Sequence, residues 1–356
     1  MSLKERMKRT AVGRLIVKTR LEHRFQKANL QATRNPETPW VNDDIPNVDL
    51  AINYARKVFS DYLERAGLDQ EQIGNKVILE IGPGKNLAVA LLFLAAGAAK
   101  VTCVDKFPSF QSREQQGLIY RSLIDSLSTI EQERLKDVIQ FENSGFELNA
   151  SRLNFARVSA EEVFSVCPKG SVDWILSRAV LEHVFEIGKA LNVFDEVLAP
   201  GGFMLHEVDF RDHGMFSASG FHPLFFLRYS QAQWNRMSDH VGAPNRKMCS
   251  YYLRFFQGKA YDLKALVVRT FMDDQRELSI PIPLDQKGRD KLFTESTGGG
   301  LYTRIWAWLN LWTSMSLPRF IAPKKPSQVK RISFPTISRR LFKSRTGERQ
   351  RFSLHT

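Results

Sequence analysis

The stretch Val77-Ile78-Leu79-Glu80-Ile81-Gly82-Pro83-Gly84-Lys85-Asn86, read with the segments that follow it, decides the fold. It begins with a short aliphatic run and ends at two glycines, which is typical of a strand that enters a tight turn. The apolar run from Leu87 to Ala99 has the length of a helix. Val101-Thr102-Cys103-Val104 is a second strand candidate, and it ends at Asp105. A strand, a tight turn, a helix and a second strand form the βαβ unit of a parallel sheet.

The two glycines and two acids of this unit predict a ligand site. Gly82 and Gly84 have no Cβ, so the backbone can approach a ligand closely. Asp105 follows about twenty residues on, where a carboxylate can accept hydrogen bonds from both hydroxyls of a ribose. A dinucleotide site requires a third glycine where this chain has Leu87, and the carboxylate of Glu80 would repel a diphosphate. That carboxylate suits a ligand with a cationic amino-acid end.

Glu80-Ile81-Gly82-Pro83-Gly84, followed by Asp105, resembles motifs I and II of the class I S-adenosylmethionine-dependent methyltransferases. The chain departs from the pattern at Asn86, where many members carry a third glycine. The resemblance implies an α/β fold: a Rossmann-like, mostly parallel seven-stranded sheet flanked by helices, with helical insertions and basic terminal extensions. It implies S-adenosylmethionine as the cofactor, with Glu80 on the methionyl ammonium, Asp105 on the ribose and Lys106 beside it.

A third motif follows the strand candidate at 153–158. The resemblance implies that Ser159, Ala160 and Glu161 contact the adenine edge of the cofactor. Ser159 with Glu162 three residues later is also a capping box, which would fix the turn that faces the ligand. Both interpretations can hold at once.

The segment 171–184 resembles the fourth strand of the family and its exit loop. Ligands of open parallel sheets bind beyond the carboxyl ends of the strands, so Ser177 and Arg178 are predicted to contact the cofactor. Leu198-Ala199-Pro200-Gly201-Gly202 before the fifth strand candidate at 203–208 is also familiar from the family. The resemblance covers about residues 75–210.

Candidate catalytic groups follow the fourth and fifth strands. If the methyl acceptor is a hydroxyl, a base must remove its proton, and histidine has a pKa near neutrality. His213 is the first candidate and His183 the second, while Asp209 or Asp212 would orient the imidazole. Alternatively, His183 only serves the turn that carries it. The three cysteines are widely spaced and odd in number, and no metal site is predicted.

Positive charge is concentrated at the two ends of the chain. The net charge is +13, with nine Lys and Arg against two Glu in residues 1–30 and twelve against one Glu in residues 301–356. The remaining middle is mildly acidic, at about −5. Contacts with an anionic membrane surface or with a nucleic acid, the less favoured partner, are therefore expected from the ends.

The predicted organisation has three parts. Residues 1–47 form a basic arm and linker. Residues 48–275 form the methyltransferase domain, with inserts at 108–150 and 211–260. Residues 276–356 form an extension with a Trp-rich helix at 301–317 and a basic tail, either an interfacial anchor or a helix docked on the domain.

Three functional hypotheses follow. In the first, a methyltransferase acts on a small organic, glycan or lipid-linked acceptor, by O-methylation with a histidine base. In the second, the basic ends hold an RNA or protein substrate. In the third, the chain binds S-adenosylmethionine without catalysis. The cysteines and the lack of a recognisable secretory signal indicate the cytoplasm, with peripheral attachment to the inner face of a membrane as an option. The sequence predicts no oligomeric state.

Overall fold

The computed structural model describes residues 10–34, 47–142, 145–238, 242–257, 259–271, 277–278, 282–283 and 307–314. Residues 1–9 of the predicted basic arm, residues 35–46 of the predicted linker at 34–47 and the predicted basic tail lie outside these residues. No helix in the described ranges is both long enough and apolar enough to cross a bilayer.

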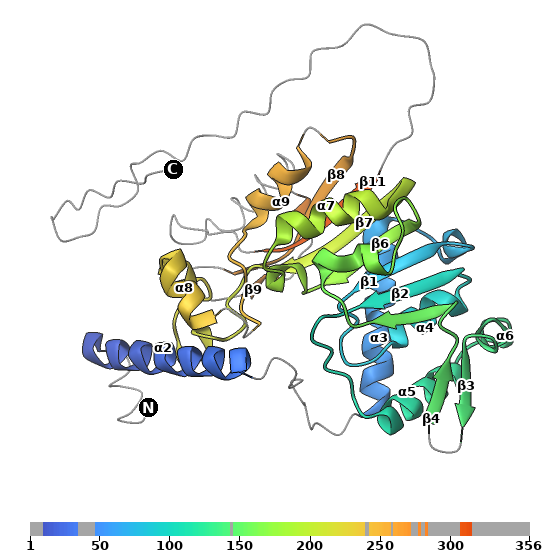
Figure 1. Cartoon of the computed structure of the whole chain (residues 1–356), viewed down its shortest axis with the longest axis horizontal. Helices are drawn as coiled ribbons and strands as arrows, with labels where there is room; N and C mark the ends of the chain where they lie inside the picture. The colour runs from blue at the N-terminus through green and yellow to red at the C-terminus, as the bar shows by residue number, and fades with distance from the viewer. Residues whose placement is uncertain are drawn as a thin grey trace, which may run out of the picture. The chain divides into compact units, whose positions relative to one another are not determined.

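A central sheet organises the fold (Figure 1). Five neighbouring strands are parallel: β5 (Leu153–Ala156), β2 (Lys100–Val104), β1 (Val77–Ile81), β6 (Val172–Arg178) and β7 (Leu198–Asp209). The predicted Rossmann-like, mostly parallel sheet is therefore confirmed. Within the described residues the sheet has nine strands rather than the predicted seven, because two-residue strands β9 (Glu277–Leu278) and β10 (Ile282–Pro283) both pair with β8 (Asp262–Phe271).

Strand β11 (Ala307–Ser314) takes the place of the central part of the predicted Trp-rich helix at 301–317, whose other residues lie outside the described ranges. It pairs antiparallel with β7 on one side and with β8 on the other, so it fills the gap between them. Its sequence Ala-Trp-Leu-Asn-Leu-Trp-Thr-Ser suits a strand, because aromatic and β-branched residues favour extended backbone. Periodicity does not separate a short apolar helix from a buried strand. The free edges of β7 and β8 decide the outcome here.

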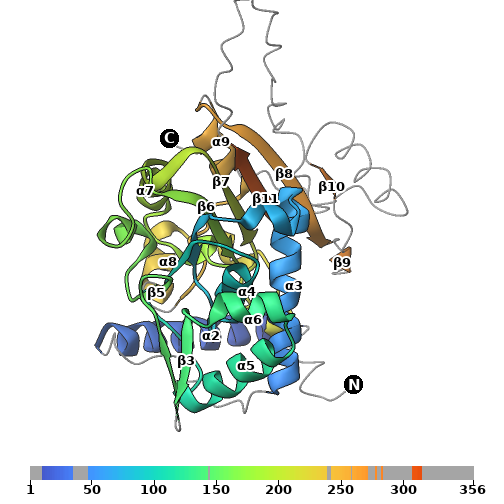
Figure 2. The ribbon, with the colours of Figure 1, turned by 90° about the vertical axis from the view of Figure 1, so that its right-hand side faces the viewer.

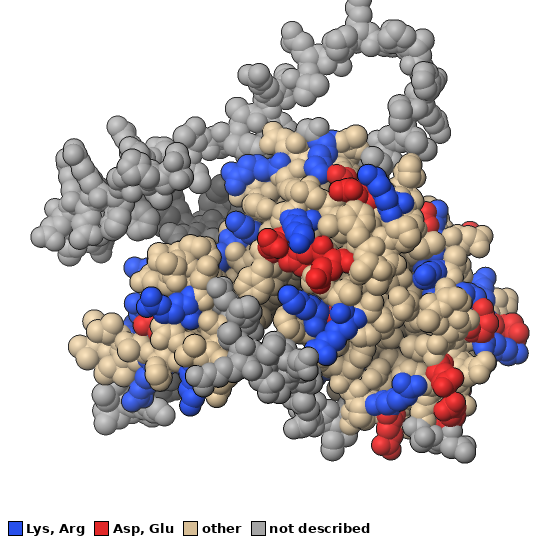
Figure 3. Space-filling model, viewed as in Figure 1, with Lys and Arg blue, Asp and Glu red and all other residues tan. Residues whose placement is uncertain are grey.

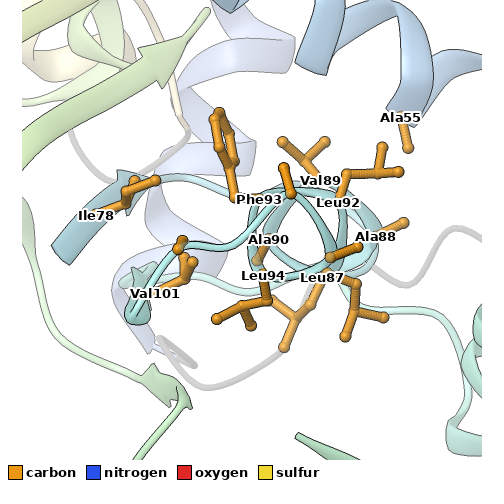
Figure 4. Close-up of a cluster of buried hydrophobic side chains, with 14 of the residues drawn as sticks. Ala55, Ile78, Leu87, Ala88, Val89, Ala90, Leu92, Phe93, Leu94 and Val101 are labelled. Carbon is orange, nitrogen blue, oxygen red and sulfur yellow. The ribbon is translucent and has the colours of Figure 1, made fainter. Parts of the chain in front are cut away.

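Two layers of helices cover the sheet (Figures 1 and 2). One face carries α3 (Val48–Ala66), α4 (Ala88–Ala95) and α5 (Arg113–Asp125), and the other carries α7 (Ile187–Val197) and α9 (Cys249–Phe256). Successive strand residues alternate between these layers: Ile78 belongs to the first core, and Leu79 and Ile81 to the second. All eight residues of α4 are buried, and Figure 4 shows Phe93, Leu94 and Ala90 on its different sides. A helix that is apolar all round must lie inside the protein.

The first insert is only partly helical. It begins with α5 and α6 (Thr129–Leu135), which agrees with the predicted helical insertion. Its second half forms a hairpin of β3 (Ile139–Glu142) and β4 (Gly145–Leu148) instead of helix. Ser128 and Glu131 form a capping box that starts α6, and the helix ends within two turns.

The second insert builds a small aromatic core of its own. Phe216, Phe226 and Trp234 are buried in it, and Trp234 lies on α8 (Gln231–Ser238). Helix α2 (Ala11–Arg34), from the predicted basic arm, packs against this insert. Phe25 of α2 lies 5.3 Å from Phe216 between ring centroids, and a guanidinium N–H of Arg14 donates to the Gly220 carbonyl (2.7 Å). The described part of the arm is thus a docked helix.

Candidate functional site

The turn after β1 strongly favours glycine at position 82. Gly82 has φ +70°, and its N–H donates to the Val104 carbonyl at the end of β2 (2.8 Å). A Cβ on Gly82 would lie 2.4 Å from Cγ2 of Val180, far inside van der Waals contact. Gly84 has φ +80° but open space around it. The backbone at Gly82 therefore runs directly against the exit loop of β6.

A cavity of about 670 Å³ lies beyond the carboxyl ends of β1, β2, β5 and β6. Its size falls within the range of roughly 300–1,000 Å³ that ligand sites occupy. Six of the predicted cofactor residues line it: Gly82, Asp105, Lys106, Ser159, Ala160 and Glu161. The opposite side is formed by the second insert, through Trp234, Asn235 and Asn245. The strand ends therefore form one wall of the cavity, and the second insert forms the opposite wall.

Asp105 lies at the wall of this cavity. Its Oδ1 accepts a hydrogen bond from the Phe107 N–H (2.8 Å), which fixes the carboxylate just after β2. Burial raises the pKa of Asp105, although the Phe107 hydrogen bond opposes the rise. A partly buried carboxylate with a free lone pair is suited to hydroxyl donors of a ligand.

The predicted capping box at Ser159 is present. Ser159 Oγ donates to Glu162 Oε2 (2.7 Å), and the Ser159 N–H donates to the same oxygen (3.1 Å). This fixes the turn after β5, so the backbone of Ser159 and Ala160 faces the cavity in a defined conformation.

Glu80 faces the helix layer rather than the cavity. It is 4% exposed, and the Cys103 thiol donates to its Oε2 (3.6 Å between Sγ and Oε2). Burial raises the pKa of Glu80 to about 7. The carboxylate belongs to the α3 side of the sheet because side chains of a strand alternate, and Ile81 takes the other side. In this structure the Glu80 carboxylate does not face the cavity, so its contact with a methionyl ammonium stays a prediction.

Ser177 and Arg178 have other partners. Ser177 is fully buried, and its Oγ lies 2.8 Å from Nδ1 of His206. The guanidinium of Arg178 donates to Asp61 of α3 (2.7 Å) and lies 3.6 Å from Glu207. Neither residue lines the 670 Å³ cavity. Arg178 joins the sheet to α3, whereas Ser177 lies on the α7 side, where the ring of His206 stacks on that of Phe194 at 5.8 Å between centroids. Their predicted contact with the cofactor stays a prediction.

The predicted catalytic residues gather beside the cavity, next to a buried carboxylate. His183 lines the cavity, and its ring centroid lies 4.7 Å from that of His213. Nε2 of His213 lies 3.6 Å from Oε1 of Glu182 and 3.9 Å from Oδ2 of Asp209. Burial lowers the pKa of His183. Burial also acts to lower the pKa of His213, but Glu182 and Asp209 outweigh it and raise the value.

The loop after β7 holds His213 in an unfavourable conformation. Its φ is +50°, a backbone conformation that residues other than glycine rarely adopt. Asp212 is fully buried and fixes this loop: its carboxylate accepts from the N–H groups of Gly214 (3.1 Å), Phe216 (2.8 Å) and Ser217 (2.8 Å). Asp212 therefore holds the loop rather than the imidazole. Asp209 is paired with Arg211 (2.6 Å) and is the carboxylate of the two that approaches His213.

Sequence reasoning missed two residues of this cluster. Glu182 was not assigned a role, although it stands directly before His183 and is 1% exposed. Asn245 was not singled out, because no motif marks it. Its side-chain N–H groups donate to the carbonyls of Leu181 (2.8 Å) and Val184 (2.7 Å), so it fixes the turn that carries Glu182 and His183.

The chain is similar to known methyltransferases. Residues 52–258 match the family model of a methyltransferase domain. An S-adenosylmethionine-dependent methyltransferase of Mesorhizobium loti is 15% identical, with 70% of this chain and 94% of that chain covered at a TM-score of 0.37. Phosphoethanolamine N-methyltransferase 2 of Haemonchus contortus, solved in complex with S-adenosylmethionine, is 15% identical. The match covers 73% of this chain and 52% of that chain at a TM-score of 0.40. No curated protein matches the chain.

The parallel sheet, the glycine turn at Gly82 and the acid after β2 define an α/β enzyme with a ligand site at the carboxyl edge of its strands. The domain match covers more than half of the chain and makes the identification specific. The protein belongs to the class I S-adenosylmethionine-dependent methyltransferases, and S-adenosylmethionine is its cofactor. The residues present fit that cofactor, because Gly82 leaves room at the turn and Asp105 lines a cavity of suitable size.

Proposed function

We propose that this enzyme methylates an oxygen of a small organic acceptor, either free or as part of a glycan or a lipid-linked molecule. The observation that carries the proposal is the shape of the cavity. It runs from the strand ends that face the cofactor to α8, where Trp234 and Asn235 line it. An aromatic side chain with a few polar groups in a concave space is typical of a site for an organic ligand.

The residues beside the cavity supply the acid–base chemistry of the proposal. S-adenosylmethionine, when bound, carries a methyl group on a sulfonium that needs no further activation. An acceptor hydroxyl must lose its proton as its oxygen forms the new bond to carbon. His213 is proposed as the base and His183, which lines the cavity, as the second candidate. Glu182 and Asp209 lie within 4 Å of His213 Nε2 and would stabilise the imidazolium that forms.

Charge on the described part of one face of the molecule favours an organic acceptor over RNA. On the face in Figure 3, Lys and Arg alternate with Asp and Glu and form no continuous basic stripe. A nucleic-acid site is expected to show such a stripe, because phosphate contacts dominate affinity. Modification of RNA or protein, and binding of the cofactor without catalysis, remain the competing functions.

The docked helix α2 supports the proposed location at the inner face of a membrane. Val12 (68% exposed), Leu15 (60%) and Ile16 (44%) project from it, with Arg20 and Arg24 also exposed further along the helix. Apolar side chains next to cations are suited to an anionic bilayer surface. A lipid-linked acceptor would be presented at this surface. Flotation with anionic liposomes, compared between the wild type and Leu15→Glu, tests the location.

The experiment that tests the function is a transfer assay. The purified chain is incubated with methyl-labelled S-adenosylmethionine and separate fractions of small metabolites, glycans, lipids, RNA and protein. Label in the first three fractions that hot hydriodic acid releases as methyl iodide, as it does from a methyl ether, supports O-methylation of an organic acceptor. Label in RNA or protein contradicts it. The variant Gly82→Val, which blocks the turn beside the cofactor, is expected to transfer no label.

A further inference from the structure

We propose that Glu182, His183 and His213 form a binding site for one divalent first-row cation, such as Zn²⁺ or Mn²⁺, at the edge of the cavity. The role of this cation in catalysis rests on the proposed function, whereas its binding does not. The site is built from residues of two neighbouring strand exits, after β6 and after β7.

Three ligand atoms converge from separate parts of the chain. Each of the three residues offers one atom, and these atoms all lie within 4.8 Å of one another. The His213 Nε2 to Glu182 Oε1 distance is 3.6 Å, which is already close to the ~3.4 Å between two ligands of a tetrahedral ion bound at about 2.1 Å. Small rotations of the side chains would bring all three atoms to coordination distance of one ion.

Glu182 is the observation that points to a cation. It is 1% exposed, and neither of its carboxylate oxygens has a hydrogen-bond partner within the described residues. Nδ1 of His183 is likewise buried with no such partner there. A buried carboxylate without hydrogen bonds is costly, and buried charges in proteins are generally paired or bound to a metal. The charge partner of Glu182 among the described residues is His213 Nε2, an ion pair at 3.6 Å, and a bound cation would take the place of the imidazolium proton in this pairing.

The surroundings hold these ligands in place before any ion binds. Asn245 fixes the turn of Glu182 and His183 through two carbonyls, and buried Asp212 fixes the strained loop of His213. Asp209 Oδ2 lies 3.9 Å from His213 Nε2. Asp209 is paired with Arg211, which suits an outer partner that orients a ligand rather than a ligand itself. Backbone strain of this kind is tolerated at sites where geometry serves a function.

The donor set selects the class of cation. Two imidazole nitrogens and one carboxylate oxygen suit Zn²⁺, Mn²⁺ or Fe²⁺ better than Mg²⁺ or Ca²⁺, which prefer oxygen ligands alone. Three protein ligands leave a coordination position for an acceptor oxygen, and His183 places the site at the cavity wall. The cation would lower the pKa of a bound hydroxyl, whose proton would pass to water. With the cation bound, His213 would act as a ligand and not as the base.

The test is direct measurement of cation binding by the full chain. Protein stripped with a chelator is titrated with Zn²⁺ by calorimetry and with Mn²⁺ by electron paramagnetic resonance. We expect about one equivalent per chain, and binding at least roughly 100-fold weaker in Glu182→Gln and in His213→Ala, which each remove a ligand. His23→Ala and Glu133→Gln, which change exposed residues on α2 and α6, serve as matched controls and are expected to bind like the wild type.

Folding and cofactor binding are measured on the same samples. Circular dichroism and calorimetry with S-adenosylmethionine show whether each variant is folded. If a variant fails to fold, the change in the Tm of the wild type on addition of Zn²⁺ or Mn²⁺ is measured instead. Absence of any change counts against the site. Cofactor binding without any cation binding, or cation binding that neither variant weakens, overturns the cation site and leaves the proposed function standing. Cation binding with no methyl transfer to any organic fraction overturns the proposed function alone.

Discussion

Nε2 of His213 lies 3.6 Å from Oε1 of Glu182, a carboxylate that is buried beside the cavity. The two residues follow neighbouring parallel strands, β6 and β7, whose carboxyl ends meet at one edge of the sheet. That edge is where an α/β sheet places its ligands. The pair therefore connects the fold to the chemistry, whether as a base with its supporting carboxylate or as two ligands of a cation.

Replacing His213 separates catalysis from cofactor binding. His213→Ala is expected to lower kcat by about 10²-fold or more, because it removes either the base or a cation ligand. The affinity for S-adenosylmethionine, measured by calorimetry, should stay within about twofold, because His213 does not line the cavity in which Gly82 and Asp105 lie. His23→Ala is the matched control. Turnover at the wild-type level in His213→Ala would exclude both roles.

Glu80 is expected to make stability depend on pH. Its pKa is raised to about 7 in the folded protein from 4.5, so folding favours the protonated acid. Its favourable contribution is complete below about pH 4.5 and is lost as pH rises through about 7, a change of ~3 kcal/mol. Glu80→Gln should therefore raise Tm relative to the wild type at pH 8 and leave it nearly unchanged at pH 4.5.

The same variant tests the predicted role of Glu80 in cofactor binding. If an ammonium approaches Glu80, binding of S-adenosylmethionine favours the ionised carboxylate and is accompanied by proton release near pH 6. Glu80→Gln would then weaken binding while it stabilises the protein. Equal affinity of wild type and variant, with no proton release in buffers of different ionisation enthalpy, would remove Glu80 from the site.

The close approach of Gly82 to Val180 predicts that a substitution at Val180 compensates for one at Gly82. Gly82→Ala places a Cβ 2.4 Å from Val180 Cγ2 at a φ of +70°, so we expect a loss of about 1–3 kcal/mol in unfolding free energy and weaker cofactor binding. Adding Val180→Ala should restore part of the stability, because it removes the atom that clashes. Gly84→Ala, with nothing within 4 Å, isolates the cost of positive φ alone. Absence of any rescue would mean that contact with Val180 does not determine the turn.

The ion pair between Arg178 and Asp61 should matter for stability and not for binding. Both side chains are less than a fifth exposed, at 18% and 17%, and the pair joins β6 to α3. Asp61→Asn is expected to cost about 1–3 kcal/mol in urea unfolding, because it removes the hydrogen-bonded carboxylate of a partly buried guanidinium and, among the described residues, leaves only the Glu207 carboxylate near it. Affinity for S-adenosylmethionine should be retained. A large loss of affinity without loss of stability would instead support the predicted cofactor contact of Arg178.

The local sequence determined the βαβ unit. Gly82 and Gly84 mark a turn that other residues do not readily form, and Asp105 ends the next strand, so fold class and cofactor follow from one stretch of about thirty residues. Short motifs of this kind are read correctly because the backbone conformation they require is local. The turn at Ser159 was predicted for the same reason, since a capping box involves residues three apart.

Side-chain direction and long-range pairing were decided only by the tertiary structure. Glu80 stands beside the motif glycines, yet strand alternation turns it toward α3. Ser177 and Arg178 end the right strand, but His206 and Asp61 engage them from distant parts of the chain. The segment 307–314 became a strand because β7 and β8 offered it two edges. The sequence alone determined which residues make the turn and the strands, because those choices depend on near neighbours. Which carboxylate meets which imidazole was set by packing, because Glu182 and His213 approach each other only once the sheet is assembled.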